Sequence, residues 1–373
     1  MKTWIEVSGQ ALRSNYQTIK AAVSPAQVLA VVKSDAYGHG LEQVAEVLKD
    51  FTDGFAVDRA EEGMKLRALG ITQSIVILGY TEPSLLKQAI QARLELTVAD
   101  LEQLEQLHFT TQEERSPVSI HLEVETGLYR QGIPEDQLVR IAELLRRMPW
   151  VTVKGLYTHF ANVEEDEDGT YPKEQLARFA QSQSALAEAG IHPTLRHTAC
   201  SAAALGLPAS RFEAVRVGIA LYGLWSSELT EKQAGALGIA SGALQPVLTW
   251  KTVITQTKLV AAGETIGYAR SARVTRETRI AVLPIGYYDG YSRSLSSRGA
   301  VVIQDVLCPI IGRICMNMCM VDVTDVPGAL PVGTEVVLIG QGMPAVEVCR
   351  RAETIHHELF ARLSSTIPRR LVD

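Results

Sequence analysis

The sequence has few features of a secreted, membrane-spanning or nucleic-acid-binding protein. Only five of its 373 residues are cysteines, and an odd, scattered set does not form a disulfide framework. No apolar run approaches the roughly 20 residues that cross a bilayer. The first residues, "MKTWIEVSGQ", hold no apolar signal core. The net charge of −6 argues against a nucleic-acid partner. We therefore expect a cytoplasmic protein with no membrane or nucleic-acid partner.

Two short segments have metal-binding residue types without the required spacing. "CMNMC", residues 315–319, has an uncommon spacing for zinc, and no second Cys or His pair follows it. "EEDEDG", residues 164–169, lacks the alternate-position ligands and closing Glu of a calcium loop. We predict no metal site, a buried strand for the first segment and a solvated loop for the second.

What the sequence does have, through its first 225 residues, is an alternation of short β-branched runs with amphipathic helical segments. The predicted strands are "VLAVVK" (28–33), "GFAVD" (54–58), "SIVILG" (74–79), "LELTV" (94–98), "SIHLEVE" (119–125), "TVKGLYTH" (152–159), "TLRHTA" (194–199) and "AVRVGI" (214–219). Eight strand-then-helix repeats favour a closed (β/α)₈ barrel, with an extra helix before it at residues 8–23. An open doubly wound sheet is the alternative. It would normally show a Gly-rich fingerprint after its first strand, and "KSDAYGHG" is not one.

The pattern changes after about residue 235. From Gln245 the chain alternates as in "VLTWKTVITQTKLV", with frequent turn residues and little helix before residues 345–363. This is typical of antiparallel sheet. We predict an α/β protein with an N-terminal TIM barrel, residues 8–232, and a mainly antiparallel β domain, residues 233–373, which the N-terminal strand 1–7 joins.

Charged residues gather where the predicted barrel strands end, which is where barrel enzymes carry their chemistry. Those residues are Lys33, Glu123, Glu125, Arg130, His159, His197 and Arg216. A strand-end lysine is most often a surface residue, an arginine a salt-bridge partner and a histidine a neutral core residue. Their clustering favours a site instead, because a desolvated lysine beside other cations can bond covalently to an aldehyde.

Pyridoxal phosphate is the cofactor that such a barrel lysine usually carries, and it needs a phosphate site. Barrels often build one after strands seven and eight, where this chain offers Ser201, Gly218 and Ile219, with Tyr37 as a further donor. Arg216 bears on reaction type. A guanidinium facing the pyridine nitrogen keeps its proton, so the ring stays a weak electron sink, which favours simple loss and return of an α-proton.

Several motifs together resemble those of the bacterial alanine racemases. They are "AVVKSDAYGHG", "HLEVETGLYRQG", "GLYTHFA", "RHTACSAAAL", "VRVGIALYG", "GYARS", "PIGYYDGYSR" and "GRICMNMCMVDV". The resemblance covers nearly the whole chain. It implies a cytoplasmic homodimer with shared active sites that uses pyridoxal phosphate to interconvert L- and D-alanine, and so makes D-alanine for peptidoglycan.

The resemblance also implies roles for single residues. Lys33 would carry the cofactor and act as one base, and Tyr268 of the second subunit would be the opposing base. Tyr268 without the resemblance would be taken as a core or interface residue. The other cofactor contacts would be Tyr37, His159, His197, Ser201, Arg216, Gly218 and Ile219. His159 would lie between Tyr268 and Arg216. Substrate-side residues would be Arg130, Tyr287 and Met316, the last two from the partner subunit.

Four positions depart from the common family pattern. Glu123 stands where many members have a carbamylated lysine, and we hypothesise that its carboxylate replaces the carbamate beside Arg130. Asn317 stands where an aspartate is common. Ser365 falls near the position of a pocket tyrosine, so serine could be accepted with alanine. Cys200 replaces a more frequent asparagine, and no physical reading is attached to it.

Three other functions remain open from the sequence. A serine/alanine racemase of broader specificity would use the same residues. A related barrel decarboxylase would be expected to have a carboxylate in place of Arg216. A non-catalytic cofactor-binding barrel would generally lack the second domain, which here carries Tyr268.

Overall fold

A computed structural model describes all residues, 1–373, and the chain divides into two compact units. The barrel unit comprises Ala11–Ala36 and Val44–Gln245. The β unit comprises Met1–Gln10, Tyr37–Gln43 and Pro246–Asp373. No helix combines the length and apolar character needed to cross a membrane.

Eight parallel strands form the barrel, as the sequence predicts. Their order is β8-β7-β6-β5-β4-β3-β2-β9. The bounds are β2 (Gln27–Val31), β3 (Gly54–Val57), β4 (Ser74–Ile77), β5 (Glu95–Val98), β6 (Val118–Glu123), β7 (Val151–Tyr157), β8 (Leu195–His197) and β9 (Ala214–Val217). The Arg216 N–H donates to the Ala199 carbonyl at 2.9 Å, which joins β9 to the residues after β8. The β-branched runs suit these positions because most strands are buried on both faces.

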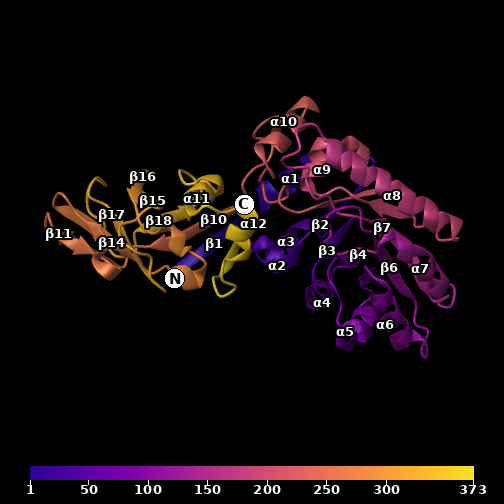
Figure 1. The fold of residues 1–373 in the computed structure, drawn as a ribbon. Coiled ribbons are helices and arrows are strands. Elements are labelled where there is room, and N and C mark those ends of the chain that lie inside the picture. The colour runs from indigo at the N-terminus through magenta and orange to yellow at the C-terminus, as the bar shows by residue number, and fades with distance from the viewer. The chain divides into compact units, whose positions relative to one another are not determined.

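Helices follow the strands and cover the outside of the barrel (Figure 1). Their bounds are α1 (Gly9–Val23), α3 (Leu41–Leu48), α4 (Ala60–Ala68), α5 (Pro83–Gln91), α6 (Leu101–Thr111), α7 (Leu138–Leu145), α8 (Thr170–Glu188), α9 (Ser201–Gly206) and α10 (Glu228–Ala236), with the short 3₁₀ turns η1 (Glu135–Gln137) and η2 (Pro208–Ser210). In α7 the buried residues Leu138, Ile141, Ala142 and Leu145 follow the helical period. Asp100 accepts from the Gln103 N–H and fixes the start of α6.

The β unit contains three sheets, which are antiparallel except at one pair. The six-stranded sheet has the order β16-β15-β18-β10-β1-β19, and β1 pairs with β19 in parallel. A three-stranded sheet, β11-β14-β17, and the β12-β13 hairpin complete it. The bounds are β1 (Thr3–Ser8), β10 (Leu248–Val253), β11 (Gln256–Val260), β12 (Thr265–Ile266), β13 (Ala272–Arg273), β14 (Thr278–Leu283), β15 (Ala300–Ile303), β16 (Val306–Pro309), β17 (Cys319–Asp322), β18 (Glu335–Ile339) and β19 (Arg369–Val372).

The helical pattern at residues 345–363 is two helices. They are α11 (Ala345–Ala352) and α12 (His356–Ala361), and Glu353 between them has a φ of 56°. A left-handed residue cannot continue a right-handed helix, so the segment turns there. The 3₁₀ turns of this unit are η3 (Tyr268–Arg270), η4 (Tyr287–Asp289) and η5 (Arg293–Leu295).

Candidate active site

Lys33 lies in a left-handed turn after the first barrel strand. The sequence places Lys33 at the strand end, whereas β2 ends at Val31 and Lys33 begins the segment α2 (Lys33–Tyr37). Ser34, Asp35, Ala36 and Tyr37 all have φ between 52° and 56°. Four consecutive non-glycine residues in this conformation cost about 1–2 kcal/mol each. Such strain persists where surrounding contacts impose it, and is common at functional sites.

Glu62 supplies one of those contacts, at Ser34. Its Oε1 accepts from the Ser34 N–H at 2.6 Å, and its Oε2 accepts from the N–H groups of Asp58 at 3.0 Å and Arg59 at 3.3 Å. Asp58, directly after β3, places Oδ1 3.3 Å from the Lys33 Nζ. One carboxylate therefore ties together the backbone beside Lys33 and the residue that pairs with its ammonium. Sequence reasoning missed both Asp58 and Glu62.

His159 is half-buried, and the charges of three cations act on it. Burial lowers its pKa well below the usual value, and Arg216, Arg130 and Lys33 lower it further. The imidazole is therefore neutral. Its Nδ1 lies 3.2 Å from Arg216 Nη2, which can only donate, so Nδ1 accepts and the proton sits on Nε2. The site thus holds a neutral N–H donor beside Arg216.

Arg216 is a buried residue whose guanidinium has one N–H group without an acceptor in the chain. Nη1 donates to His197 Nδ1 at 2.8 Å and to the His197 carbonyl, and Nη2 donates to the Thr158 carbonyl at 2.8 Å and to His159. Both terminal nitrogens are occupied, while Nε–H makes no hydrogen bond within the chain. An unused N–H donor of this kind suits an aromatic ring nitrogen, which is an acceptor.

Ser201, Gly218 and Ile219 form a cluster of buried donors after strands β8 and β9. The Gly218 N–H donates to Ser201 Oγ at 3.0 Å, and the Ala220 N–H lies 3.4 Å from the same atom. Ile219 is 2% exposed, and its N–H has no acceptor in the chain. Backbone donors beside the start of a short helix fit an anionic group such as a phosphate.

Glu123 is buried and bonds to neighbours other than Arg130. Its Oε2 accepts from Tyr157 Oη at 2.9 Å and from Gln131 Nε2. Burial raises its pKa, and the Gln131 and Tyr157 hydrogen bonds and the charges of Arg216 and Arg130 oppose that rise. Arg130 is exposed and makes no hydrogen bond or ion pair with Glu123. The hypothesis that Glu123 replaces a carbamate beside Arg130 stays a prediction.

The remaining predicted residues belong to the β unit. Tyr268, Tyr287 and Met316 are 70%, 44% and 54% exposed, and Asn317 is also exposed. The Tyr287 N–H donates to the Cys315 carbonyl, which brings the loops of Tyr287 and Met316 together. Gly286 permits this approach, since a Cβ there would lie 2.2 Å from the Cys315 oxygen. Tyr37 belongs to this unit as well, and its ring lies 5.8 Å from that of His357.

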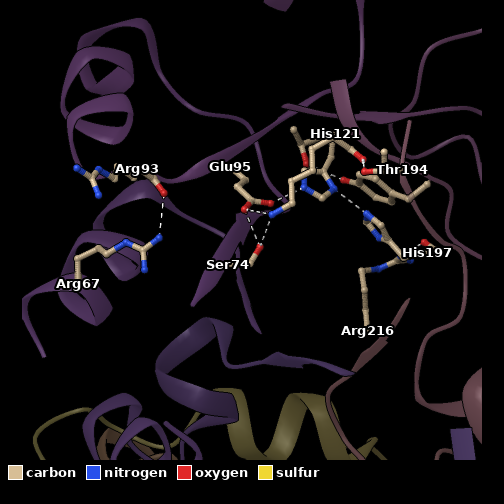
Figure 2. A network of polar contacts seen from close by, with 11 residues as sticks. Arg67, Ser74, Arg93, Glu95, His121, Thr194, His197 and Arg216 are labelled. Atoms are coloured by element: carbon tan, nitrogen blue, oxygen red, sulfur yellow. Dashed lines mark hydrogen bonds and ion pairs between the residues drawn. The ribbon is translucent and has the colours of Figure 1, made fainter. Parts of the chain in front are cut away.

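Sequence reasoning also missed a polar network inside the barrel. Figure 2 shows Glu95 beside Ser74, His121 facing His197, and Arg216 beyond His197. The sequence prediction rests on the residues at the ends of the predicted strands, and so does not include Glu95, His121 or Tyr157. A usable signal existed, because His121 and Glu123 are two residues apart on one strand and share a face.

The fold and these residues define a class of enzyme in which a barrel with a lysine at its strand-end rim is followed by a β-rich unit. The alanine racemase N-terminal domain family matches residues 7–226, and the alanine racemase C-terminal domain family matches residues 247–371. The chain belongs to the alanine racemase family.

Similar proteins support this assignment along the whole chain. An alanine racemase from Clostridium novyi is 35% identical over 98% of this chain and 94% of its own length. One from Desulforamulus reducens is 36% identical over 98% of each. The structure of Clostridium difficile alanine racemase matches with a TM-score of 0.92 and 31% identity, over 100% of this chain and 96% of that one. The Bacillus anthracis enzyme with bound L-Ala-P has a TM-score of 0.92 and 33% identity, over 100% and 95%.

Proposed function

We propose that the protein interconverts L- and D-alanine with pyridoxal phosphate as cofactor. The observation that carries this proposal is the arrangement of Lys33, His159 and Arg216 at the rim of a barrel that matches the alanine racemase family from end to end. The family assignment indicates the reaction, and the residues at the rim of the barrel have the chemical groups that this reaction needs.

The residues of the barrel unit fit the cofactor. Lys33 would carry it through Nζ, Arg216 would present its unused Nε–H to the ring nitrogen, and Ser201, Gly218 and Ile219 would bind the phosphate. Bound pyridoxal phosphate withdraws electrons from the α-carbon of an attached amino acid and so acidifies its hydrogen. Asp58, 3.3 Å from Nζ, would orient Lys33 before the cofactor is bound.

Two bases would exchange the α-proton. The Lys33 amine would remove or return it on one face of the substrate, and Tyr268 of a second subunit would do so on the other. Positioned acid–base groups of this kind typically contribute 10²–10⁴-fold, roughly, to a rate. His159 would hold the phenol of Tyr268 through its Nε2–H, because Arg216 already occupies Nδ1.

Arg216 would keep the reaction a racemisation. A guanidinium does not release its proton, so Arg216 would leave the ring nitrogen unprotonated and would favour return of the proton to the α-carbon. Arg130 and Glu123 would lie toward the substrate side, with Glu123 held by Tyr157 and acting on Arg130 through charge. Tyr287 and Met316 from the partner would limit the side chain to that of a small amino acid.

The shared site requires a homodimer. Tyr268, Tyr287 and Met316 are exposed in the single chain and so are available to a second copy. A mixing experiment tests this arrangement. Lys33→Ala and Tyr268→Ala proteins are each expected to be inactive, whereas their random dimers should recover about a quarter of wild-type activity, because half the dimers contain one intact site. No recovery in verified mixed dimers would contradict a shared site.

Chiral analysis of the product tests the reaction itself. Purified protein with added pyridoxal phosphate and L-alanine should yield equal D- and L-alanine, and the Lys33→Ala protein should not. L-serine in parallel measures how broad the specificity is. Release of carbon dioxide without racemisation would identify a decarboxylase and overturn the proposal.

A further inference from the structure

A chain of hydrogen bonds crosses the barrel core from Arg216 to Glu95. Arg216 Nη1 lies 2.8 Å from His197 Nδ1, and His197 Nε2 lies 2.8 Å from His121 Nδ1. His121 Nε2 lies 2.7 Å from Glu95 Oε2. Glu95 is the first residue of β5, whereas His197 is the last residue of β8. The chain therefore joins the strand-end rim to the opposite end of the barrel.

The chemistry of the two ends fixes the direction of every bond. A guanidinium can only donate, so His197 Nδ1 must accept and His197 carries its proton on Nε2. That proton is donated to His121 Nδ1, which leaves the His121 proton on Nε2, facing Glu95. Burial lowers the pKa of both histidines, so both are neutral. Every donor then meets an acceptor.

Glu95, at the far end of this chain of hydrogen bonds, stays ionised. Burial by itself would raise the pKa of Glu95, but hydrogen bonds from His121, Lys154 and Ser74 lower it to about 2. Ser74 Oγ donates to Oε1 at 2.7 Å, and the half-exposed Lys154 donates to the same oxygen. Glu95 is thus a permanent acceptor at working pH.

The strands that carry this chain of hydrogen bonds have irregularities that make room for it. Ile120 pairs with Val153 and His121 with Gly155, which leaves Lys154 as the extra residue of a bulge. Bulges re-aim side chains, and Lys154 reaches Glu95. Gly155 makes room for the ring, since a Cβ there would lie 2.0 Å from His121 Nδ1. An ordinary barrel core holds branched aliphatic residues in this place.

We propose that Glu95 is a positioning residue for Arg216, acting through His121 and His197. The inference rests on the proposed function, in which Arg216 faces the cofactor ring. The ionised carboxylate polarises both imidazoles toward itself, which makes His197 Nδ1 a stronger acceptor and holds the guanidinium in place. When Arg216 is held less firmly, water reaches the ring nitrogen and can protonate it.

Nitrogen-15 NMR of the cofactor-free protein tests the chain directly. In wild type both imidazoles should be neutral at pH 7, with protons on Nε2. In Glu95→Gln the His121 Nε2–H resonance should move upfield, because its acceptor loses its charge. In Lys154→Met it should move downfield, because the carboxylate loses a competing donor. A protonated Nδ1 on His197, or a charged imidazole in wild type, would overturn the proposal.

The holoenzyme tests the effect on Arg216. In Glu95→Gln the fraction of turnovers that convert the cofactor to its amine form should rise about tenfold, which corresponds to about 1.4 kcal/mol. In that side reaction the proton goes to the cofactor carbon instead of the α-carbon, and water releases the keto acid. Glu213→Gln, which breaks the ion pair with Arg196 in the same barrel, is the matched control and should leave this fraction unchanged.

An unchanged fraction in a Glu95→Gln protein whose His121 resonance has moved would refute the role of Glu95. If Glu95→Gln does not fold, Lys154→Met tests the proposal instead. The fraction of its turnovers that convert the cofactor to the amine form should be at or below that of wild type. A rise in this fraction would refute the proposal. A wild-type enzyme that fails to racemise alanine would refute the proposed function instead, and the NMR experiment would still report on the chain.

Discussion

Replacing Gly155 with alanine should break the polar chain at its centre. The new Cβ would lie 2.0 Å from His121 Nδ1, and ordinary contact begins at 3.4 Å, so the ring must retreat by about 1.4 Å. The bonds of His121 to His197 and Glu95, at 2.8 and 2.7 Å, leave no room for such a movement. At least one of the two must therefore be lost.

The loss of stability in Gly155→Ala has two causes, the overpacking at His121 and the loss of a hydrogen bond. Overpacking a core costs about 1–3 kcal/mol, and a buried hydrogen bond to a charged group is worth about 1.5–3 kcal/mol. We expect Gly155→Ala to lower the free energy of unfolding by about 3–6 kcal/mol in urea denaturation. Gly235→Ala is the control. It lies in α10 with open space around its Cβ position, and should stabilise by about 0.5–1 kcal/mol. A Gly155→Ala protein within about 1 kcal/mol of wild type, with both histidine resonances unchanged, would refute the packing argument.

Two further predictions concern carboxylates. Glu62→Gln leaves one acceptor for the N–H groups of Ser34, Asp58 and Arg59, so cofactor affinity measured by equilibrium titration should weaken by about 1–3 kcal/mol. The exposed neighbour Glu61→Gln should leave it unchanged, and equal affinity in both variants would contradict the role of Glu62. For Glu95, the fall of the pKa from 4.5 to about 2 corresponds to about 3 kcal/mol of stability, present above pH 4.5 and lost as the pH falls toward 2. The stability difference between wild type and Glu95→Gln should therefore be constant from pH 7 to 5 and shrink in more acidic urea titrations. Shrinkage already near neutral pH would assign the effect to another group.

The barrel could be predicted because its signals are local. Most strands are short β-branched runs buried on both faces, and helical patterns alternate with them along the chain. The prediction of secondary structure is wrong where non-glycine residues adopt a left-handed backbone conformation. Lys33 precedes four left-handed residues and Glu353 interrupts a helical pattern, yet none of these five residues is a glycine or an asparagine that would signal it.

The site could be predicted only where a motif lies in one stretch of sequence. Lys33 and His159 follow strands β2 and β7, and Arg216 is the last residue but one of β9, so parallel geometry brings them to one rim. The chain of hydrogen bonds from Arg216 to Glu95 joins residues of β5, β6, β8 and β9, and it depends on the bulge at Lys154. Strand pairing register and bulges between distant segments have no sequence signal of their own, so Glu95 could not be connected to Arg216 in advance.

The polar chain links two properties that barrels usually separate. Residues at the carboxyl ends of barrel strands serve chemistry, and residues at the amino ends serve stability. Arg216 is a buried charge whose hydrogen bonds all go to neutral groups, so its desolvation cost depends on how well those groups are polarised. Because Glu95 polarises His121 and, through it, His197, a substitution at Glu95 should lower stability and also loosen the position of Arg216 at the cofactor ring. A substitution at Glu213, which ends in a partly exposed ion pair, should lower stability alone.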